Sequence, residues 1–206
     1  MLVKNPWIAC MISGASSKTS TMGLSIYYQG RIKDRALLPQ LVDAVSDICR
    51  ELNWEYETFN EGGAEGMFFQ PEGSEPLSLT FDSEGRLTDF RHILLRLEFD
   101  EPVNGVIVKT QYAGREAHKA VIDLFRWLSE TYLANFEMSD ESRYWETGDE
   151  AVLCESFERY ELLLNAVARA LDTFPAQAGE SPEGTAERLS RYLRDHFGGD
   201  VHQVRE

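Results

Sequence analysis

A strand–helix–strand pattern of apolar residues occurs twice in this chain of 206 residues, and it restricts the fold more than any other feature. Apolar side chains alternate with polar ones in the strands and recur at helical spacing in the helices, as half-buried elements require. The predicted elements are a strand at 24–32, a helix at 34–52 and a strand at 54–59, then a strand at 106–112, a helix at 114–133 and a strand at 134–139.

The two copies superimpose when the chain is shifted by 80 residues, which places Ile26 on Val106. Three short strands are predicted between them, at 66–70, 77–82 and 86–90, because turns that contain glycine or proline separate these segments. We therefore predict an α+β fold. Its expected form is a ferredoxin-like split β-α-β sandwich, in which two β-α-β units share a mostly antiparallel sheet and a hairpin is added in the middle.

A long helix at 149–173 is predicted after the second unit. Its apolar residues follow one another in alternating steps of four and three, which is the spacing of a buried seam. The seam consists of Leu153, Phe157, Tyr160, Leu164, Val167, Leu171 and Phe174. Thr147 is expected to cap the first turn, with Asp149 as the alternative cap. The acidic stretch 143–161 is thus predicted to begin a helix and not to form a catalytic loop.

Composition divides the chain into three parts. Residues 1–21 end in a segment rich in serine, threonine and glycine, and we expect a flexible N-terminal extension there. Residues 22–174 are expected to form the α+β core domain, including the long helix. Residues 175–206 should contain a linker, a C-terminal helix at 183–197 and a tail.

The charge of the chain is strongly negative and unevenly distributed. The formal net charge is −15 at pH 7. Residues 51–84 carry nine acidic residues and no Lys or Arg, and residues 137–161 carry nine acidic residues and two Arg. Nucleic-acid binding is not expected, because a phosphate backbone requires a basic surface. Such acidity commonly serves solubility, and its alternative role is a surface that attracts a basic protein partner.

The sequence contains no recognisable catalytic or metal-binding pattern. The four histidines are His92, His118, His196 and His202, and no two of them have the spacing of a helical metal site. The three cysteines are widely separated, which indicates neither a disulfide framework nor a zinc site. We therefore predict no catalytic residues, no metal and no cofactor. No membrane span is expected, because no apolar run reaches about 18 residues. A cytoplasmic location is the default expectation, because the cysteines are expected to be buried free thiols.

Polar and aromatic residues near the ends of the predicted strands are the candidates for a ligand site, because α+β sheets often bind ligands there. These candidates are Tyr28, Arg31, Lys109, Gln111, Tyr112, Arg115, His118, Tyr144 and Trp145. Acidic residues on and after the last strand of each unit form a candidate interaction surface. They are Glu55, Glu57, Glu61, Glu137, Asp140 and Glu141.

These observations favour a non-catalytic binding or regulatory module that acts through protein contacts, with acidic surfaces directed toward a basic partner. The alternative is a small-molecule-binding protein or an enzyme with a pocket near residues 109–115 and 143–146. The apolar seam of the long helix has to be covered, and we expect packing within the chain to cover it. The C-terminal helix is the expected contact if the chain forms a homodimer.

Overall fold

The structure is a computed structural model, and it describes residues 24–95, 105–175, 179 and 181–197. The chain forms two compact units, residues 1–157 and residues 158–206. The boundary lies inside a helix, α6 (Glu150–Thr173). The expected extension at 1–21 lies outside the described residues, and the expected domain limits at 22 and 174 stay predictions.

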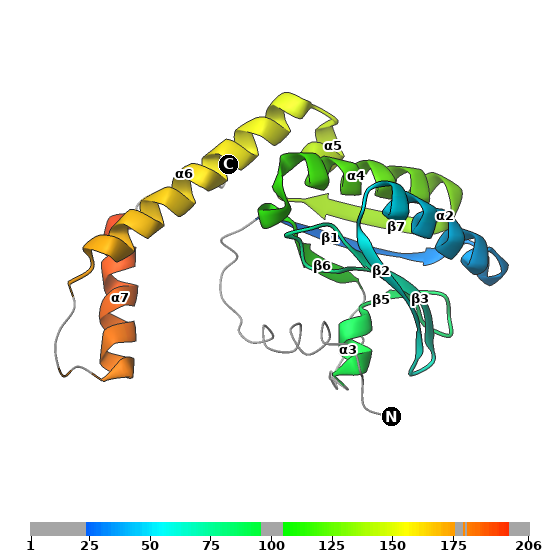
Figure 1. Ribbon diagram of the computed structural model, residues 1–206, viewed down its shortest axis with the longest axis horizontal. Coiled ribbons are helices and arrows are strands. Elements are labelled where there is room, and N and C mark those ends of the chain that lie inside the picture. The colour runs from blue at the N-terminus through cyan, green and yellow to red at the C-terminus, as the bar shows by residue number, and fades with distance from the viewer. Residues whose placement is uncertain (1–23, 96–104, 176–178, 180, 198–206) are drawn as a thin grey trace. The chain divides into compact units, whose positions relative to one another are not determined.

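The first unit contains a three-stranded antiparallel sheet whose central strand is β1 (Ser25–Ile32). Strands β6 (Val106–Lys109) and β7 (Leu133–Asp140) pair with its two sides. Helix α4 (Gly114–Thr131) connects β6 to β7 and packs on β7 (Figure 1). Since β6 and β7 run parallel to each other with β1 between them, the second predicted β-α-β unit is present and is split by the first strand.

A second antiparallel sheet has the order β2-β3-β4-β5. Its strands are β2 (Glu55–Glu61), β3 (Ala64–Gln70), β4 (Leu77–Phe81) and β5 (Leu87–Thr88). The predicted α+β class is therefore confirmed. The strands form two sheets, whereas a single shared sheet was expected, because β2 continues into a meander of hairpins and does not return to the side of β1.

Aspartate side chains cap the short 3₁₀ turn ahead of α2 and the helix α3, whereas α2 itself begins without a side-chain cap. Asp34 accepts a hydrogen bond from the backbone N–H of Ala36, ahead of a short 3₁₀ turn and α2 (Leu38–Glu51). Helix α2 contacts β2 and β3 (Figure 1). The strand expected at 86–90 ends early, because Asp89 caps helix α3 (Phe90–Leu94) by accepting from the N–H of Arg91.

Large apolar side chains fill the interior of the first unit. The largest fully buried ones are Tyr28, Phe69, Phe81, Phe90, Phe125, Ile26, Leu41, Met67, Leu77, Leu79, Ile122 and Leu128. Alternate residues of β4 lie on the two faces of its sheet, and both faces are buried. On the polar face, the hydroxyls of Ser78 and Thr80 both donate to the carbonyl of Thr88, which satisfies these buried groups.

Helix α6 confirms the predicted long helix at 149–173. Asp149 supplies the cap by accepting from the N–H of Ala151, whereas the hydroxyl of Thr147 donates to the carbonyl of Arg143. The alternative cap is therefore the correct one. The beginning of the predicted seam, with Leu153 and Phe157, is buried in the first unit.

The second unit contains the rest of α6 and helix α7 (Pro182–Phe197). The ring of Tyr192 packs edge-on against Phe174, with ring centroids 5.4 Å apart, and the guanidinium of Arg188 lies 4.2 Å from the centroid of Phe174. Two leucines of α6 in this unit, Leu162 and Leu171, are exposed. None of the described helices is long and apolar enough to cross a membrane.

Gly66 of β3 is a position where only glycine fits, and this gives a test of the fold. Its φ is +145°, and an added Cβ would overlap the carbonyl oxygen of Leu79 on the neighbouring strand. Gly66→Ala should lower the free energy of unfolding by roughly 2–4 kcal/mol, measured by urea denaturation. Gly63→Asn is the control, because that turn position has open space and asparagine tolerates its positive φ. Equal stability of the two variants would contradict the described pairing of β3 with β4.

Candidate functional site

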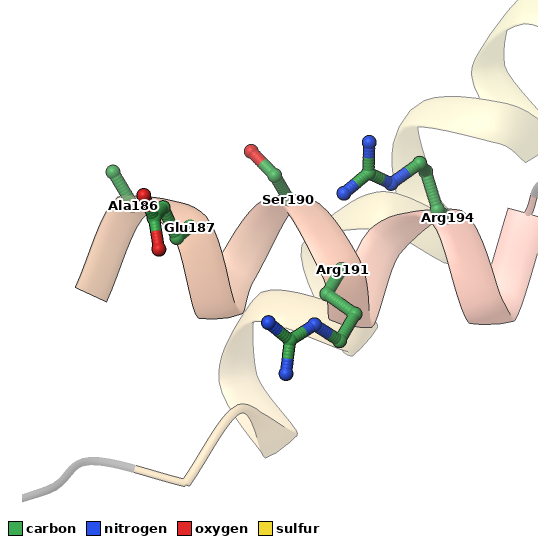
Figure 2. A pocket seen from close by; sticks show the side chains of 5 residues that line it. All are labelled: Ala186, Glu187, Ser190, Arg191 and Arg194. Atoms are coloured by element: carbon green, nitrogen blue, oxygen red, sulfur yellow. The ribbon is translucent and has the colours of Figure 1, made fainter. Parts of the chain in front are cut away.

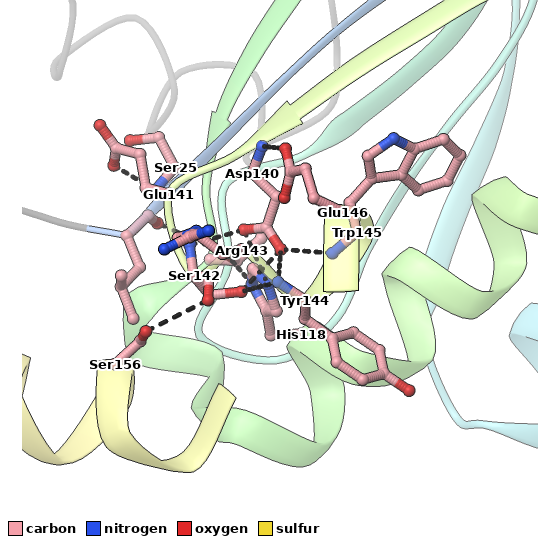
Figure 3. A network of polar contacts seen from close by, with 12 residues as sticks. Ser25, His118, Asp140, Glu141, Ser142, Arg143, Tyr144, Trp145, Glu146 and Ser156 are labelled. Atoms are coloured by element: carbon pink, nitrogen blue, oxygen red, sulfur yellow. Dashed lines mark hydrogen bonds and ion pairs between the residues drawn. The ribbon is translucent and has the colours of Figure 1, made fainter. Parts of the chain in front are cut away.

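The imidazole of His118, on α4, is the centre of a buried polar network (Figure 3). Its Nδ1 lies 2.7 Å from the hydroxyl of Thr110, just after β6. Its Nε2 lies 3.0 Å from the hydroxyl of Ser142 and 3.2 Å from Oδ1 of Asp140. The side chains of His118 and Asp140 have no exposed surface. Both ring nitrogens therefore have partners in an environment closed to solvent.

The carboxylate of Asp140 is the acceptor for several groups of the segment that follows β7. Oδ1 accepts from the N–H of Ser142, while Oδ2 accepts from the hydroxyl of Ser142 and from the N–H groups of Tyr144 and Trp145. These bonds organise the tight turn that leads into the short helix α5 (Tyr144–Thr147). A strand that ends in an Asp-x-Ser sequence can form such a turn because the carboxylate replaces backbone acceptors.

The same network fixes the start of α6 and the position of α5. The hydroxyl of Ser156 donates to the carbonyl of Ser142 across 3.1 Å. The guanidinium of Arg126, on α4, donates to the carbonyl of Tyr144 and lies 4.7 Å from the centroid of the Tyr144 ring. Three helices and the ends of two strands are therefore connected through one set of buried hydrogen bonds.

The geometry of this network differs from that of a nucleophilic triad. In a triad the serine and the carboxylate contact different nitrogens of the histidine, so that a proton can pass from the serine to the ring. Here Ser142 and Asp140 both lie at Nε2, and Thr110 occupies Nδ1. The hydroxyl of Ser142 also donates to Asp140 directly. The buried groups have a structural role, and no substrate could reach them without local unfolding.

The protonation state of Asp140 is fixed by its surroundings. Burial alone would raise its pKa, but the hydrogen bonds and charge interaction with His118 and the bonds from Ser142 outweigh burial and lower the pKa. The folded state therefore binds a proton more weakly at this carboxylate than the unfolded state does. This difference stabilises the folded state above the unfolded-state pKa of about 4, and the contribution is lost as the pH falls through the lowered folded-state pKa.

Asp140→Asn tests this role through stability and its pH dependence. The amide has one acceptor oxygen where the carboxylate has two, so its NH2 group would face a donor at one of the two positions, and the variant should be less stable by roughly 2–4 kcal/mol at pH 7. The deficit should shrink between pH 5 and pH 3, because acid removes the same contribution from the natural protein. Urea unfolding at several pH values measures both effects. A deficit that stays constant with pH would show that the ionised carboxylate is not the stabilising form.

The first group of ligand candidates does not gather in one place. Tyr28 is fully buried, and its hydroxyl donates to the carbonyl of Ser78 and accepts from the Ser78 N–H. Burial raises the pKa of Tyr28 well above its ordinary value. Arg31 is exposed and donates to the carbonyl of Glu84. The backbone N–H of Lys109 donates to the carboxylate of Glu75.

The other candidates lie around the start of α4. Gln111 is buried, and its Oε1 has no hydrogen-bond partner among the described residues. Tyr112 is exposed, and Arg115 donates to Sγ of Cys154, 3.0 Å away. Tyr144 is buried and Trp145 half-buried, and their backbone groups belong to the Asp140 network. The structure thus joins His118, Tyr144 and Trp145 into one network, which is closed to solvent at its centre.

The acidic candidates fall into three groups. Glu55, Glu57 and Glu61 are exposed on β2, which is an edge strand. Glu137 on β7 is exposed and accepts from the side-chain amide of Gln29, and Glu141 is exposed and accepts from the N–H of Ser25. Asp140 is only 3% exposed, so it belongs to the interior and not to an acidic surface. Its strand position alone did not indicate the buried turn that it organises.

Thr110, Ser142 and Ser156 complete the buried network and were missed at the sequence level. The Asp-x-Ser sequence at 140–142 was an available signal, because this pattern after a strand is typical of side-chain-capped turns. The contribution of Thr110 and Ser156 depends on how β6 and α6 pack, and no local pattern contains that information.

The described residues offer no other chemical centre. They contain no group of three or more His, Cys, Asp or Glu side chains that could hold a metal ion. A depression on α7 is lined by Ala186, Glu187, Ser190, Arg191 and Arg194 (Figure 2). All five residues come from one helix, so this depression is an open surface hollow and not an enclosed ligand pocket.

Comparison of the chain with protein-family models, with curated proteins and with solved structures gave no match.

Proposed function

We propose that the protein is a non-catalytic binding or regulatory module that recognises a basic protein partner through the acidic strand β2. The observation that carries this proposal is the exposure of Glu55, Glu57 and Glu61 on one face of an edge strand. Alternate residues of a strand lie on the same face, so the three carboxylates form an acidic row, which the buried side chain of Phe59 interrupts between Glu57 and Glu61. A row of like charges attracts oppositely charged partners and accelerates their association.

The surroundings of β2 support its role as the attractive surface. Several other acidic residues of the same chain segment form ion pairs within the protein: Glu65 pairs with Arg35, and Asp82 and Glu84 pair with Arg86. Glu55 and Glu61 form no ion pair with any residue that the structure describes. On β2, Glu55 and Glu61 thus keep a charge that no described ion pair neutralises.

Charge reversal on β2 tests the proposal. Proteins captured from a lysate of the source cells by the natural protein would be compared with those captured by the variant Glu55→Lys, Glu57→Lys, Glu61→Lys. We expect the variant to lose at least one basic protein. The purified complex should lose at least about tenfold in association rate on charge reversal, and its rate should fall with added salt.

The matched control carries Glu155→Lys, Glu158→Lys and Glu161→Lys on exposed positions of α6, which changes the net charge equally. It should keep the captured basic protein, because the attraction is local to β2. Loss of binding in both variants would indicate a general charge effect, and association rates independent of salt would contradict the electrostatic proposal.

The alternative function, a small-molecule site or enzyme near residues 109–115 and 143–146, has one supporting observation. The side-chain oxygens of Gln111 and Ser25 are buried without a hydrogen-bond partner among the described residues. Such atoms are uncommon in folded proteins and can mark a bound polar group. The binding module remains the better supported proposal, because Tyr144 and Trp145 are held in the closed Asp140 network.

Three further expectations belong to the same proposal. A ferredoxin-like arrangement of the first unit is supported by the split order β6-β1-β7 with α4 as the crossover. A cytoplasmic location is supported by the buried thiol of Cys49, which is in no disulfide. Homodimer formation through the C-terminal helix is a further prediction, and the exposed Leu162 and Leu171 of α6 are apolar side chains of the same unit that a second copy could cover.

Light scattering tests the dimer. Deletion of 176–206 should halve the measured mass if α7 forms the dimer contact, while circular dichroism should show that the first unit stays folded. An unchanged mass would remove α7 from the contact, and an unfolded product would show that α7 belongs to the folding core.

A further inference from the structure

The outer edge of β2 combines free backbone groups with the acidic row. β2 is at the end of its sheet and pairs with β3 over seven consecutive positions, from Glu55 with Gln70 to Glu61 with Ala64, with no register shift. A long, regular edge strand is a template for another strand, because its outward N–H and C=O groups repeat at strand spacing.

The hairpin turn shows which backbone groups are available. Gly62 and Gly63 both have positive φ, 59° and 81°, as in a two-residue type I′ turn. The closing pair of such a turn, Glu61 with Ala64, exchanges both backbone hydrogen bonds, and every second residue before it does the same. The backbone groups of the intervening residues therefore point away from β3. These residues are Tyr56, Thr58 and Asn60.

These outward groups are unused within the described chain, in contrast to those of a comparable edge. No described residue makes a hydrogen bond to the outward backbone groups of Tyr56, Thr58 or Asn60. On the edge strand β6, by contrast, Arg91 donates to the carbonyl of Ile107, and Lys109 exchanges hydrogen bonds with Glu75. The edge of β6 is thus protected by side chains, whereas the edge of β2 remains open.

We infer that β2 is a strand-addition site for a basic extended segment of the partner. This inference rests on the proposed function and specifies the binding mode. An antiparallel partner strand would bond to the outward groups of Tyr56, Thr58 and Asn60. Its residues opposite Glu55, Glu57 and Glu61 would occupy non-hydrogen-bonded pairs, where side chains of neighbouring strands lie closest. Lysine or arginine at these alternate positions would face the acidic row directly.

A second copy of the chain is a poorer occupant for this edge. Antiparallel pairing of two β2 strands about Thr58 would place Glu55 of each copy opposite Glu61 of the other. Like charges directly opposite each other destabilise a strand pair. The acidic row thus disfavours self-association along the edge and favours a basic strand.

The probe is a synthetic peptide of about nine residues that alternates lysine with threonine, which has strand propensity. Fluorescence anisotropy with the full chain at low salt should show binding. Binding should weaken at least about tenfold when the threonine amides are N-methylated, because this change removes the hydrogen bonds to β2 and keeps every charge. Thr58→Pro should have the same effect, since proline removes the outward N–H and leaves the pairing with β3.

The outcomes separate the binding mode from the function. Equal affinity for both peptides would overturn strand addition and leave the acidic surface of the proposed function intact. Failure of the unmethylated peptide to bind would also overturn strand addition by a basic segment. The proposed function is tested separately, by the capture of a basic protein with the natural protein and the β2 charge-reversal variant. Circular dichroism shows whether the Thr58→Pro variant folds. If the variant does not fold, comparison of the methylated and unmethylated peptides on the natural protein still tests strand addition.

Discussion

The buried carboxylate of Asp140 is the interaction on which the second half of the first unit depends. It accepts hydrogen bonds from the turn after β7 and contacts His118 of α4, and the turn in turn accepts from Ser156 of α6. A buried carboxylate is costly unless its acceptor capacity is satisfied. At this position several hydrogen-bond donors offset the cost of burying the Asp140 carboxylate. The carboxylate therefore determines the path of the chain from β7 to α5, although it would destabilise a purely apolar core.

This dependence explains why the polar candidates of the sequence did not form an accessible site. Histidine, serine and aspartate within one network resemble catalytic chemistry in composition. Their positions around a single ring nitrogen, in a volume without exposed surface, assign them to structure. Residue types are a weak indicator of chemistry until the geometry shows which atoms face each other and whether solvent reaches them.

The elements that could be predicted are those whose signal is local. The helical spacing in 149–173 and the alternation in 24–32 each depend only on neighbouring residues, and α6 and β1 match them closely. The division into two sheets depends on which strands pair when they lie far apart in the sequence. The spacing of apolar residues within a strand does not indicate its partner strand. Likewise, Glu57 and Asp140 are both acidic residues on or at the end of a strand. The turn donors of Asp140 are local in sequence, but its contact with His118 depends on how α4 packs, which a local pattern does not contain.

Charged residues on an edge strand commonly protect that edge against aggregation, and this accounts in part for the acidic residues of β2. That explanation and a binding role are compatible, because both follow from the same electrostatics. Glu55, Glu57 and Glu61 repel another acidic edge, including β2 of a second copy, and attract a strand that carries positive charge at alternate positions. Protection alone, however, requires only that the edge be made unfavourable, as the side chains that occupy the outward groups of β6 achieve. On β2 the outward backbone groups stay available for pairing along a regular strand, while the negative charge repels acidic strands. This combination selects a basic strand, whereas simple protection of the edge would exclude every strand.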